Sequence, residues 1–495
     1  MFSSLGIDTP TLILLCLAIL LALSFEFVNG FHDTANAVAT VIYTNTLKPY
    51  QAVIWSGAWN LIGVLLSSGA VAFGIVALLP VELVINVGSG AGFAMVFALL
   101  LSAIIWNLGT WYLGLPASSS HTLIGSIVGV GLMNSLLSPG SAFGDGVNWA
   151  KVADTVKALV FSPLIGFVVA GLLLLAARFL LRIPALYKSP EGKNPPPWWI
   201  RLLLIFTCTG VSFAHGSNDG QKGMGLIMLI LVGIVPASFA LNLNTSAATL
   251  AQISASAQAF DQQLHTAGVN PLPAGTDGAH KALTQYLKKS ALAPDTLPSL
   301  STLNHNVLQA LNGVNGLNSV SGDQRRALRM DIYLVSESLA RLIKTKQLPA
   351  GFDATALSGY QSLLKGTTNY IPVWVKVAVA LALGLGTMIG WKRIVVTVGE
   401  KIGKAHLTYA QGAAAELVAF GTIEAADILG LPVSTTHVLS SGIAGTMVAN
   451  QSGLQKDTVR DILLAWVLTL PVCVALGATL FGAGLLLVFR VLGMH

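Results

Sequence analysis

Apolar runs long enough to cross a lipid bilayer recur along the whole chain and restrict its fold more than any other feature. These runs occupy residues 11–28, 51–79, 91–113, 155–181, 202–214, 223–241, 371–390, 405–430 and 461–489. Only 10% of the residues are charged, whereas a soluble globular protein has about 25%. The sequence therefore predicts an all-α polytopic membrane protein with about 10–12 membrane segments. Because some runs are too long for one straight crossing and others too short, we expect tilted and broken helices or re-entrant hairpins.

A polar stripe follows the first apolar run. At about 100° per residue, five polar side chains fall on one face of a helix: Glu26, Asn29, Asp33, Asn36 and Thr40. An ionised aspartate at the centre of a bilayer costs roughly 2.5–3.5 kcal/mol. We therefore expect Asp33 to act on an ion or a solute, and His32 beside it is a candidate proton relay.

Two pairs of motifs indicate an internal duplication. The stretch Gly30-Phe-His-Asp-Thr-Ala-Asn-Ala37 has a partner in Gly216-Ser-Asn-Asp-Gly-Gln-Lys-Gly223. The stretch Gly114-Leu-Pro-Ala-Ser-Ser-Ser-His-Thr122 matches Gly430-Leu-Pro-Val-Ser-Thr-Thr-His-Val438. Either match alone would be weak, but the two pairs occur in the same order in each half of the chain.

The spacing of these motifs locates an insertion in the second half. Asp33 and His121 are 88 residues apart, whereas Asp219 and His437 are 218 apart. A polar segment rich in Asn, Gln, Ser and Pro supplies almost all of the difference and predicts a small extramembrane helical domain. The predicted organisation is a first membrane repeat (1–182), a basic proline-rich linker (183–200), the start of a second repeat (201–242), the insertion (243–370) and the remainder of the second repeat (371–495).

The distribution of Lys and Arg predicts the orientation. With the N-terminus outside, the segments that face the cytoplasm hold nearly all the basic residues of the short loops. These residues are Lys48, Arg178, Arg182, Lys188, Lys193, Arg201, Lys392, Arg393, Lys401, Lys404, Lys456 and Arg460. The two halves then enter the membrane from opposite sides, as an inverted repeat, and both termini and the insertion lie outside.

The second aspartate motif carries a stripe comparable to the first. Ser212, His215, Asp219 and Lys222 share one helical face, and Asn218 and Gln221 adjoin it. On a functional interpretation, Asp33 and Asp219 bind a cation or a proton and are oriented by nearby amides. On the alternative, each aspartate pairs with a neighbouring His or Lys and stabilises helix packing. His215, like His32, abuts an aspartate and is a candidate proton relay.

The proline-serine motifs predict two helix breaks. Pro116 and Pro432 interrupt a helix, and a cluster of hydroxyls then opens the next helical segment. Helix N-termini present unpaired N–H groups and a partial positive charge, which suits an oxyanion. On the alternative, the hydroxyls bond their own backbone. His121 and His437 follow the hydroxyls and could donate to the anion, carry protons or fix the local fold.

These four motifs closely resemble those of the inorganic phosphate transporter (PiT) family, in particular its bacterial low-affinity branch. The resemblance rests on residues 30–40, 106–125, 215–225 and 431–441, which agree with the family in order. It implies a secondary transporter that moves phosphate through an inverted-repeat scaffold. One departure matters: the family signature commonly reads Gly-Ala-Asn-Asp, and the first copy here has Phe31 and His32, which puts sodium coupling in doubt. The bacterial branch is linked to protons and to neutral complexes of phosphate with divalent metals.

The candidate site residues fall into three groups. The coupling-ion or proton group comprises Glu26, His32, Asp33, Asn36, His215, Asn218 and Asp219. The phosphate-binding group comprises Ser118, Ser119, Ser120, Thr122, Gln221, Lys222, Ser434, Thr435 and Thr436. Pro116, His121, Pro432 and His437 form the helix-break and support group.

The sequence thus predicts a symporter of a bacterial inner membrane that imports inorganic phosphate by alternating access, as a neutral metal-phosphate complex together with protons. No tightly bound cofactor and no nucleic-acid partner are expected. The ions concerned are H⁺ or Na⁺, with Mg²⁺ or another divalent metal carried with the substrate and no fixed metal. No Gly-x-x-x-x-Gly-Lys-(Ser/Thr) loop occurs, so transport should be secondary and not driven by ATP. A homodimer is compatible with the resemblance and with the glycine-rich helices.

Four alternatives stay open at this point. The first is sodium coupling, and the second is another tetrahedral oxyanion, such as sulfate or arsenate. An intramembrane metal-dependent hydrolase would also use Asp and His residues, although no His-Glu-x-x-His motif occurs. The last is a sensor that recruits a partner through the insertion.

Overall fold

The computed structural model describes residues 7–33, 35–79, 88–138, 140–145, 147–289 and 291–491, without the side chains of residues 35, 36 and 491. Every regular element in these ranges is a helix, as predicted. The first half contains α1 (Thr9–Asp33), α2 (Ala35–Tyr43), α3 (Pro49–Leu66), α4 (Ala70–Val76), α6 (Gly90–Tyr112), α7 (Ser119–Leu137) and α8 (Trp149–Leu180). After η2 (Pro184–Tyr187), the second half contains α9 (Trp198–Ile234), α10 (Pro236–Phe239), α16 (Val373–Met388), α17 (Lys392–Val396), η4 (Thr397–Lys401), α18 (Tyr409–Ile428), α19 (Thr435–Ala449), α20 (Lys456–Leu486) and η5 (Leu487–Val491).

Six helical segments of the described residues are long and apolar enough to cross a membrane. They are Thr9–Tyr43, Gly90–Tyr112, Ser119–Leu137, Trp149–Leu180, Trp198–Ile234 and Lys456–Arg490. A further span is broken: α3 and α4 meet at 76°, where Gly69 has a φ of 87°. The predicted breaks at the proline-serine motifs are also present, between α6 and α7 and between α18 and α19. Gly114 and Gly430 make these two turns with φ angles of 69° and 62°, a region that favours glycine.

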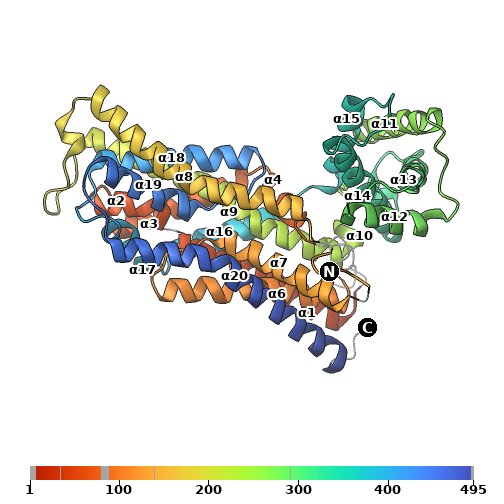
Figure 1. Ribbon diagram of the computed structural model, residues 1–495, viewed down its shortest axis with the longest axis horizontal. Coiled ribbons are helices and arrows are strands. Elements are labelled where there is room, and N and C mark those ends of the chain that lie inside the picture. Colours follow the sequence, from red (N-terminus) through yellow and green to blue (C-terminus); the bar gives the residue numbers. More distant parts are fainter. Residues whose placement is uncertain are drawn as a thin grey trace.

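Helices of the two halves pack against each other in exchanged pairs. α8 of the first half packs on α19 of the second, and α20 of the second packs on α7 of the first. In the same way α3 packs on α9, and α16 packs on α1 (Figure 1). This exchange agrees with the duplication, because each pair joins a helix of the first half to one of the second. It brings the motifs of both halves to the middle of one bundle.

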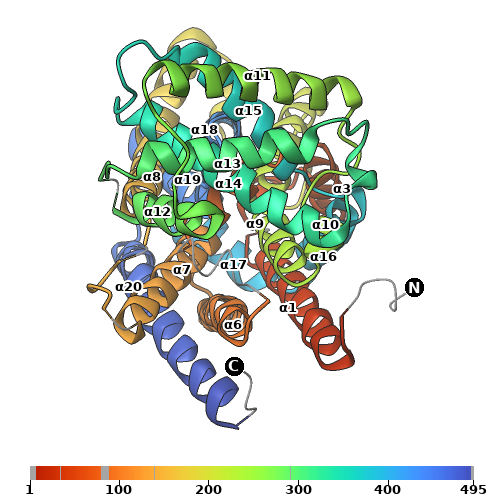
Figure 2. The same ribbon diagram turned by 90° about the vertical axis from the view of Figure 1, so that its right-hand side faces the viewer.

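The insertion forms a separate helical unit at one end of this bundle (Figure 1). It contains α11 (Ala247–Thr266), α12 (Gly275–Lys289), α13 (Thr296–Leu311), η3 (Leu317–Ser319), α14 (Gly322–Lys344) and α15 (Ala354–Thr368). Its apolar core, which includes Phe260, Leu300 and Leu339, is distinct from the two cores of the membrane bundle. Figure 2 looks onto this end and shows the insertion lying across part of the bundle, while α1, α6 and α20 project beside it.

The two ends of the bundle differ in what they carry. The start of α1 and the end of α20 lie at the same end as the insertion, and residues 183–197 lie at the opposite end (Figure 1). At that opposite end Asn45 donates to Gly192 O at 3.0 Å, and Lys404 N donates to Gly453 O at 3.1 Å. The structure therefore places basic loops of the bundle at one end, and the start of α1 and the end of α20 at the other. That the basic end faces the cytoplasm stays a prediction from charge.

Close backbone contact between the halves gives a stability test. A methyl group on Gly386 of α16 would overlap the Phe27 carbonyl of α1, whereas one on Gly421 of α18 would meet no heavy atom within 4 Å. Gly386→Ala should therefore destabilise the protein by about 1–3 kcal/mol through overpacking. The same change at exposed Gly421 should stabilise it by up to about 1 kcal/mol through helix propensity. Thermal denaturation of both variants in one detergent measures the difference, and equal shifts would contradict the packing of α16 on α1.

Candidate functional site

The two motif aspartates meet in the centre of the bundle. Asp33 is the last residue of α1 and Asp219 lies in the middle of α9; their exposed fractions are 2% and 0%. His215, one turn before Asp219, places its Nε2 3.8 Å from Asp33 Oδ2 and 3.5 Å from Asp219 Oδ2. The imidazole therefore lies between the carboxylates. The other ring nitrogen of His215, Nδ1, is hydrogen-bonded to Oδ1 of Asn60 in α3 at 2.8 Å.

A buried lysine neutralises one of the two carboxylates. Lys222, one turn after Asp219 on α9, is 0% exposed. Its Nζ lies 2.7 Å from Asp219 Oδ2 and donates to Ser119 Oγ at 3.0 Å. On the first aspartate, His32 Nδ1 lies 3.4 Å from Asp33 Oδ1, and His32 Nε2 lies 3.1 Å from Thr110 Oγ1. Among the described residues, the cationic partners in contact with Asp33 are histidines, whereas Asp219 also has Lys222.

Serine caps open the two helices that follow the proline breaks. Ser118 accepts from His121 N at 3.2 Å at the start of α7, and Ser434 accepts from His437 N at 3.1 Å at the start of α19. Each cap satisfies one of the first N–H groups and fixes where the helix begins. The partial positive charge of a helix N-terminus acts at each of these helix starts.

Hydroxyls from both helix starts contact the aspartates. Ser119 Oγ lies 3.1 Å from Asp33 Oδ2 and 3.3 Å from Asp219 Oδ2, and Thr436 Oγ1 donates to Asp33 Oδ1. Ser120 Oγ donates to Val433 O at 2.8 Å, so the two broken segments also touch each other. The predicted cation residues and the predicted hydroxyl residues therefore form one buried cluster. We call Asp33, His215, Asp219, Lys222, Ser119 and Thr436 the central cluster.

The central cluster can hold a cation. One ligand atom each from Asp33, His215 and Asp219 lies within 4.8 Å of the others, and all three side chains are buried. Carboxylate oxygens suit Mg²⁺ and similar ions, and an imidazole suits a proton or a transition metal. Within the cluster, His215 Nε2 and Asp219 Oδ1 are buried and accept or donate no hydrogen bond to the described residues. Buried polar groups are nearly always paired, so these two atoms are available to a cation or a proton.

The two support histidines lie against each other with tilted rings. The rings of His121 and His437 are 4.6 Å apart, and His437 stacks on Trp466 at 3.9 Å. Trp466 Nε1 in turn donates to Pro116 O at 2.9 Å. These contacts join the first break to α20 and give both histidines a packing role.

Other predicted site residues lie outside the central cluster. Thr122 donates to Asn107 Oδ1 at 3.0 Å, one turn further into α7. Gln221 donates to Asp427 Oδ1 at 2.5 Å and accepts from Val71 N at 2.9 Å.

Asn218, from the coupling-ion group, also lies outside the cluster: its Nδ2 donates to Leu431 O at 3.3 Å, in the second break. Glu26 is buried against Gly223 and accepts from Asn29 at 3.4 Å. Ser118, Ser434 and Pro432 belong to the breaks, Thr435 begins α19, and the Asn36 side chain lies outside the described residues.

Three buried polar residues beside the candidate site escaped the sequence analysis. Asn60 orients His215, Asp427 binds Gln221, and the carboxyl group of Glu416 contacts the hydroxyls of Thr40 and Thr207. The apolar run 405–430 contains both carboxylates. The rule that singled out Asp33, an acidic residue inside a membrane span, could have identified them.

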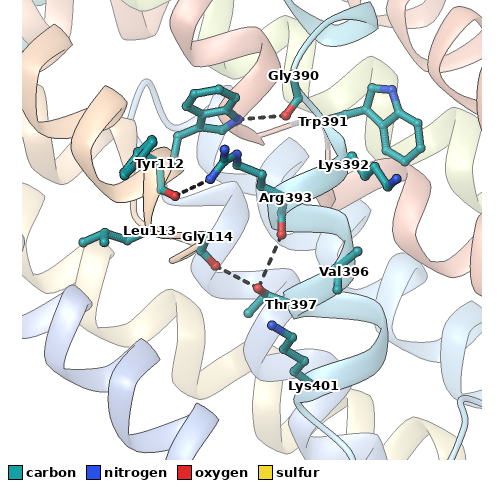
Figure 3. Close-up of a pocket in the computed structure, with 11 residues that line it drawn as sticks. Tyr112, Leu113, Gly114, Gly390, Trp391, Lys392, Arg393, Val396, Thr397 and Lys401 are labelled. Carbon is teal, nitrogen blue, oxygen red and sulfur yellow. Dashed lines mark hydrogen bonds between the residues drawn. The ribbon is translucent and has the colours of Figure 1, made fainter.

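A basic groove adjoins the turn before α7 (Figure 3). Its volume is about 650 Å³, and its lining includes the cations Lys392, Arg393 and Lys401. Arg393 Nη1 donates to Tyr112 O at 2.7 Å, and Thr397 Oγ1 donates to Gly114 O at 2.8 Å. The groove shares no residue with the central cluster, but its wall fixes the turn that leads to Ser119.

Comparisons with known proteins agree with this architecture. The family model described as "Phosphate transporter family" matches residues 29–477. The low-affinity inorganic phosphate transporter PitB of Escherichia coli (strain K12) is 44% identical over 98% of this chain and 99% of its own length. PitA of the same strain is 44% identical over 96% and 97%. A solved structure titled "The sodium-dependent phosphate transporter" has a TM-score of 0.52 and 20% identity, covering 95% of this chain and 98% of its own, and shows the same fold.

The pair of Lys222 and Asp219 can be tested as a unit. Asp219→Asn leaves a buried ammonium and Lys222→Gln leaves a buried carboxylate, so each should cost roughly 3–5 kcal/mol of stability. The double variant removes both charges and should be more stable than either single variant. The melting temperatures of the wild type, the two single variants and the double variant, measured in one detergent, complete a double-mutant cycle. Additive losses would show that the two charges do not interact.

Proposed function

The chain belongs to the phosphate transporter family, and on that premise we propose that it imports phosphate by secondary symport with protons, as a neutral complex with a divalent metal. Membership makes it a transporter and not an enzyme, and bacterial relatives such as PitA and PitB indicate a multi-pass inner-membrane protein. The observation that supports the coupled mechanism is the single central cluster, in which carboxylates and anion-binding helix starts share one site.

Charge provides the reason for coupling. A phosphate dianion next to Asp33 and Asp219 would be repelled, because Lys222 supplies only one fixed positive charge. A divalent metal or a proton that enters with the phosphate offsets this repulsion. A cation alone would bind to carboxylates while the N–H groups and hydroxyls of α7 and α19 lack an anion. Anion and cation therefore bind better together than apart, which is the thermodynamic basis of symport.

The donor set favours protons and divalent metals over sodium as coupling ions. His215 Nε2 lies between the two carboxylates, and an imidazole nitrogen is a proton acceptor or a metal ligand. A neutral metal-hydrogenphosphate that enters with one proton carries one net positive charge. That charge gains roughly 2.3 kcal/mol per 100 mV of membrane potential, which supports accumulation.

The position of the cluster supports the proposal of alternating access. It is buried in the described conformation and is assembled from α1 and α7 of the first half and α9 and α19 of the second. A movement of one set of helices against the other would open it to one side of the membrane, as in other inverted-repeat transporters.

Gradient-driven uptake tests the coupling. We expect radiolabelled phosphate to enter proteoliposomes when a proton gradient is imposed with magnesium present, and to enter far less with a sodium gradient alone or with chelator. Uptake driven by sodium only would overturn proton coupling. Sulfate or arsenate as competitor measures the selectivity among tetrahedral oxyanions.

The aspartates should be needed for this uptake. Asp33→Asn and Asp219→Asn each remove a buried charge that the cation would contact, and such losses cost about 2–5 kcal/mol of binding. We expect initial rates to fall at least tenfold, a lower bound from that range. Asp323→Asn, at an exposed position in the insertion, is the matched control. Near-normal uptake by either cluster variant, with unchanged insertion into the membrane, would reduce that aspartate to a packing role.

A further inference from the structure

A buried glutamate between the two halves lies outside the central cluster. Glu416, in the middle of α18, is 0% exposed. Its Oε1 is hydrogen-bonded to the hydroxyl of Thr40 in α2, and its Oε2 is hydrogen-bonded to the hydroxyl of Thr207 in α9. The carboxyl group thus lies between the halves, because α2 belongs to the first and α9 and α18 to the second.

No positive charge accompanies this carboxyl group. The elements packed on α18 are α2, α4, α8, α9, α19 and η2. Among the described residues of these elements, no charged side chain acts on Glu416, and the titratable neighbour is the thiol of Cys208. An ionised carboxylate buried in a membrane protein without a counter-charge is costly. A bound proton removes that cost.

Counting hydrogens places the proton. The hydroxyl of Thr207 has one hydrogen, and its Oγ1 lies 3.1 Å from Leu204 O as well as next to Glu416 Oε2. If the hydroxyl donates to the Leu204 carbonyl, the bond to Oε2 needs a hydrogen from the carboxyl group. The network is then complete: Thr40 donates to Oε1, Oε2–H donates to Thr207, and Thr207 donates to Leu204 O.

We propose that Glu416 is a second proton-binding site of the transporter, which loses and regains this proton during transport. The inference rests on the proposed proton coupling and adds a group that carries the proton. When Glu416 releases the proton, the Oε2–H bond breaks, the proton passes to water, and the electron pair of that bond stays on the carboxylate.

The threonines connect this site to the central cluster. Thr40 lies seven residues after Asp33, and Thr207 lies twelve residues before Asp219 on the same helix α9. A movement of α2 or α9 that accompanies loading of the aspartates would therefore break a hydrogen bond to Glu416 and admit water. The release of the proton is thereby tied to the position of the helices that hold phosphate.

Glu416→Gln tests the site because glutamine keeps the shape and neutrality of the protonated acid but cannot release the proton. In proteoliposomes with equal phosphate and magnesium on both sides, we expect the variant to exchange labelled phosphate. We also expect it to lose the acceleration that an imposed pH gradient gives the wild type. Glu416→Asp should restore part of that acceleration. Glu424→Gln, the same change on the same helix at a half-buried position, should leave it unchanged.

The outcomes separate the inference from the proposed function. If wild-type uptake responds to a proton gradient and Glu416→Gln responds equally, the proton site is wrong and proton coupling stands. If the wild type does not respond, proton coupling itself fails, and Glu416 is judged by infrared difference spectra recorded on adding phosphate and magnesium. A carboxylic C=O band that changes in the wild type and is missing in Glu416→Gln supports the site, and no such band overturns it. If Glu416→Gln does not fold, Thr207→Val is the second variant. It removes the hydroxyl that accepts the hydrogen bond from Glu416, so the carboxylic C=O band of Glu416 must shift.

Discussion

Two carboxylates buried between helix N-termini determine how the rest of this structure is built. Asp33 and Asp219 are both withdrawn from solvent, which is costly unless each charge is compensated. The compensation comes from Lys222, one turn after Asp219 on α9, and from two hydroxyls distant in sequence, those of Ser119 at the start of α7 and Thr436 at the start of α19. For those groups to converge, α7 and α19 must begin inside the bundle. The breaks at Pro116 and Pro432 and the left-handed glycines before them are therefore requirements of the site and not accidents of the fold.

Duplication explains how so much polar chemistry fits into an apolar bundle. One half cannot surround its own aspartate, because its broken helix contributes a single N-terminus. The exchanged packing of α8 on α19 and α20 on α7 supplies the second. Glycines at the crossings allow this closeness: a methyl on Gly445 would overlap the backbone of Phe167, and one on Gly129 would overlap that of Val474. Tight helix crossings thus contribute to the site as directly as the polar residues do.

Local patterns predicted much of this arrangement, and tertiary contacts decided the remainder. The apolar runs and the repeated motifs were sufficient to predict an all-helical fold and the breaks at Pro116 and Pro432, and they selected Asp33, Asp219 and Ser119 as candidates. The sequence could not show that these carboxylates and hydroxyls lie in one cluster, because that depends on how α1, α7, α9 and α19 cross. For the same reason it gave no partner for Gln221, whose bond to Asp427 spans 206 residues. Thr40 was recognised as part of a polar stripe, but its acceptor Glu416 lies on a helix of the other half.

The two repeats have diverged where charge matters, and this asymmetry bears on mechanism. At equivalent positions the first motif has His32 and Asn36, and the second has Asn218 and Lys222. The lysine forms a 2.7 Å ion pair with Asp219, so the charge of that carboxylate is offset whether or not substrate is present. Among the described residues, Asp33 forms close ionic contacts with His32 and His215, and a histidine carries a charge only when protonated. On the proposed mechanism, Asp33 is therefore the carboxylate whose charge the coupling ion would balance in each cycle. A symmetric pair of lysines would have balanced both permanently and removed the electrostatic reason for a coupling ion.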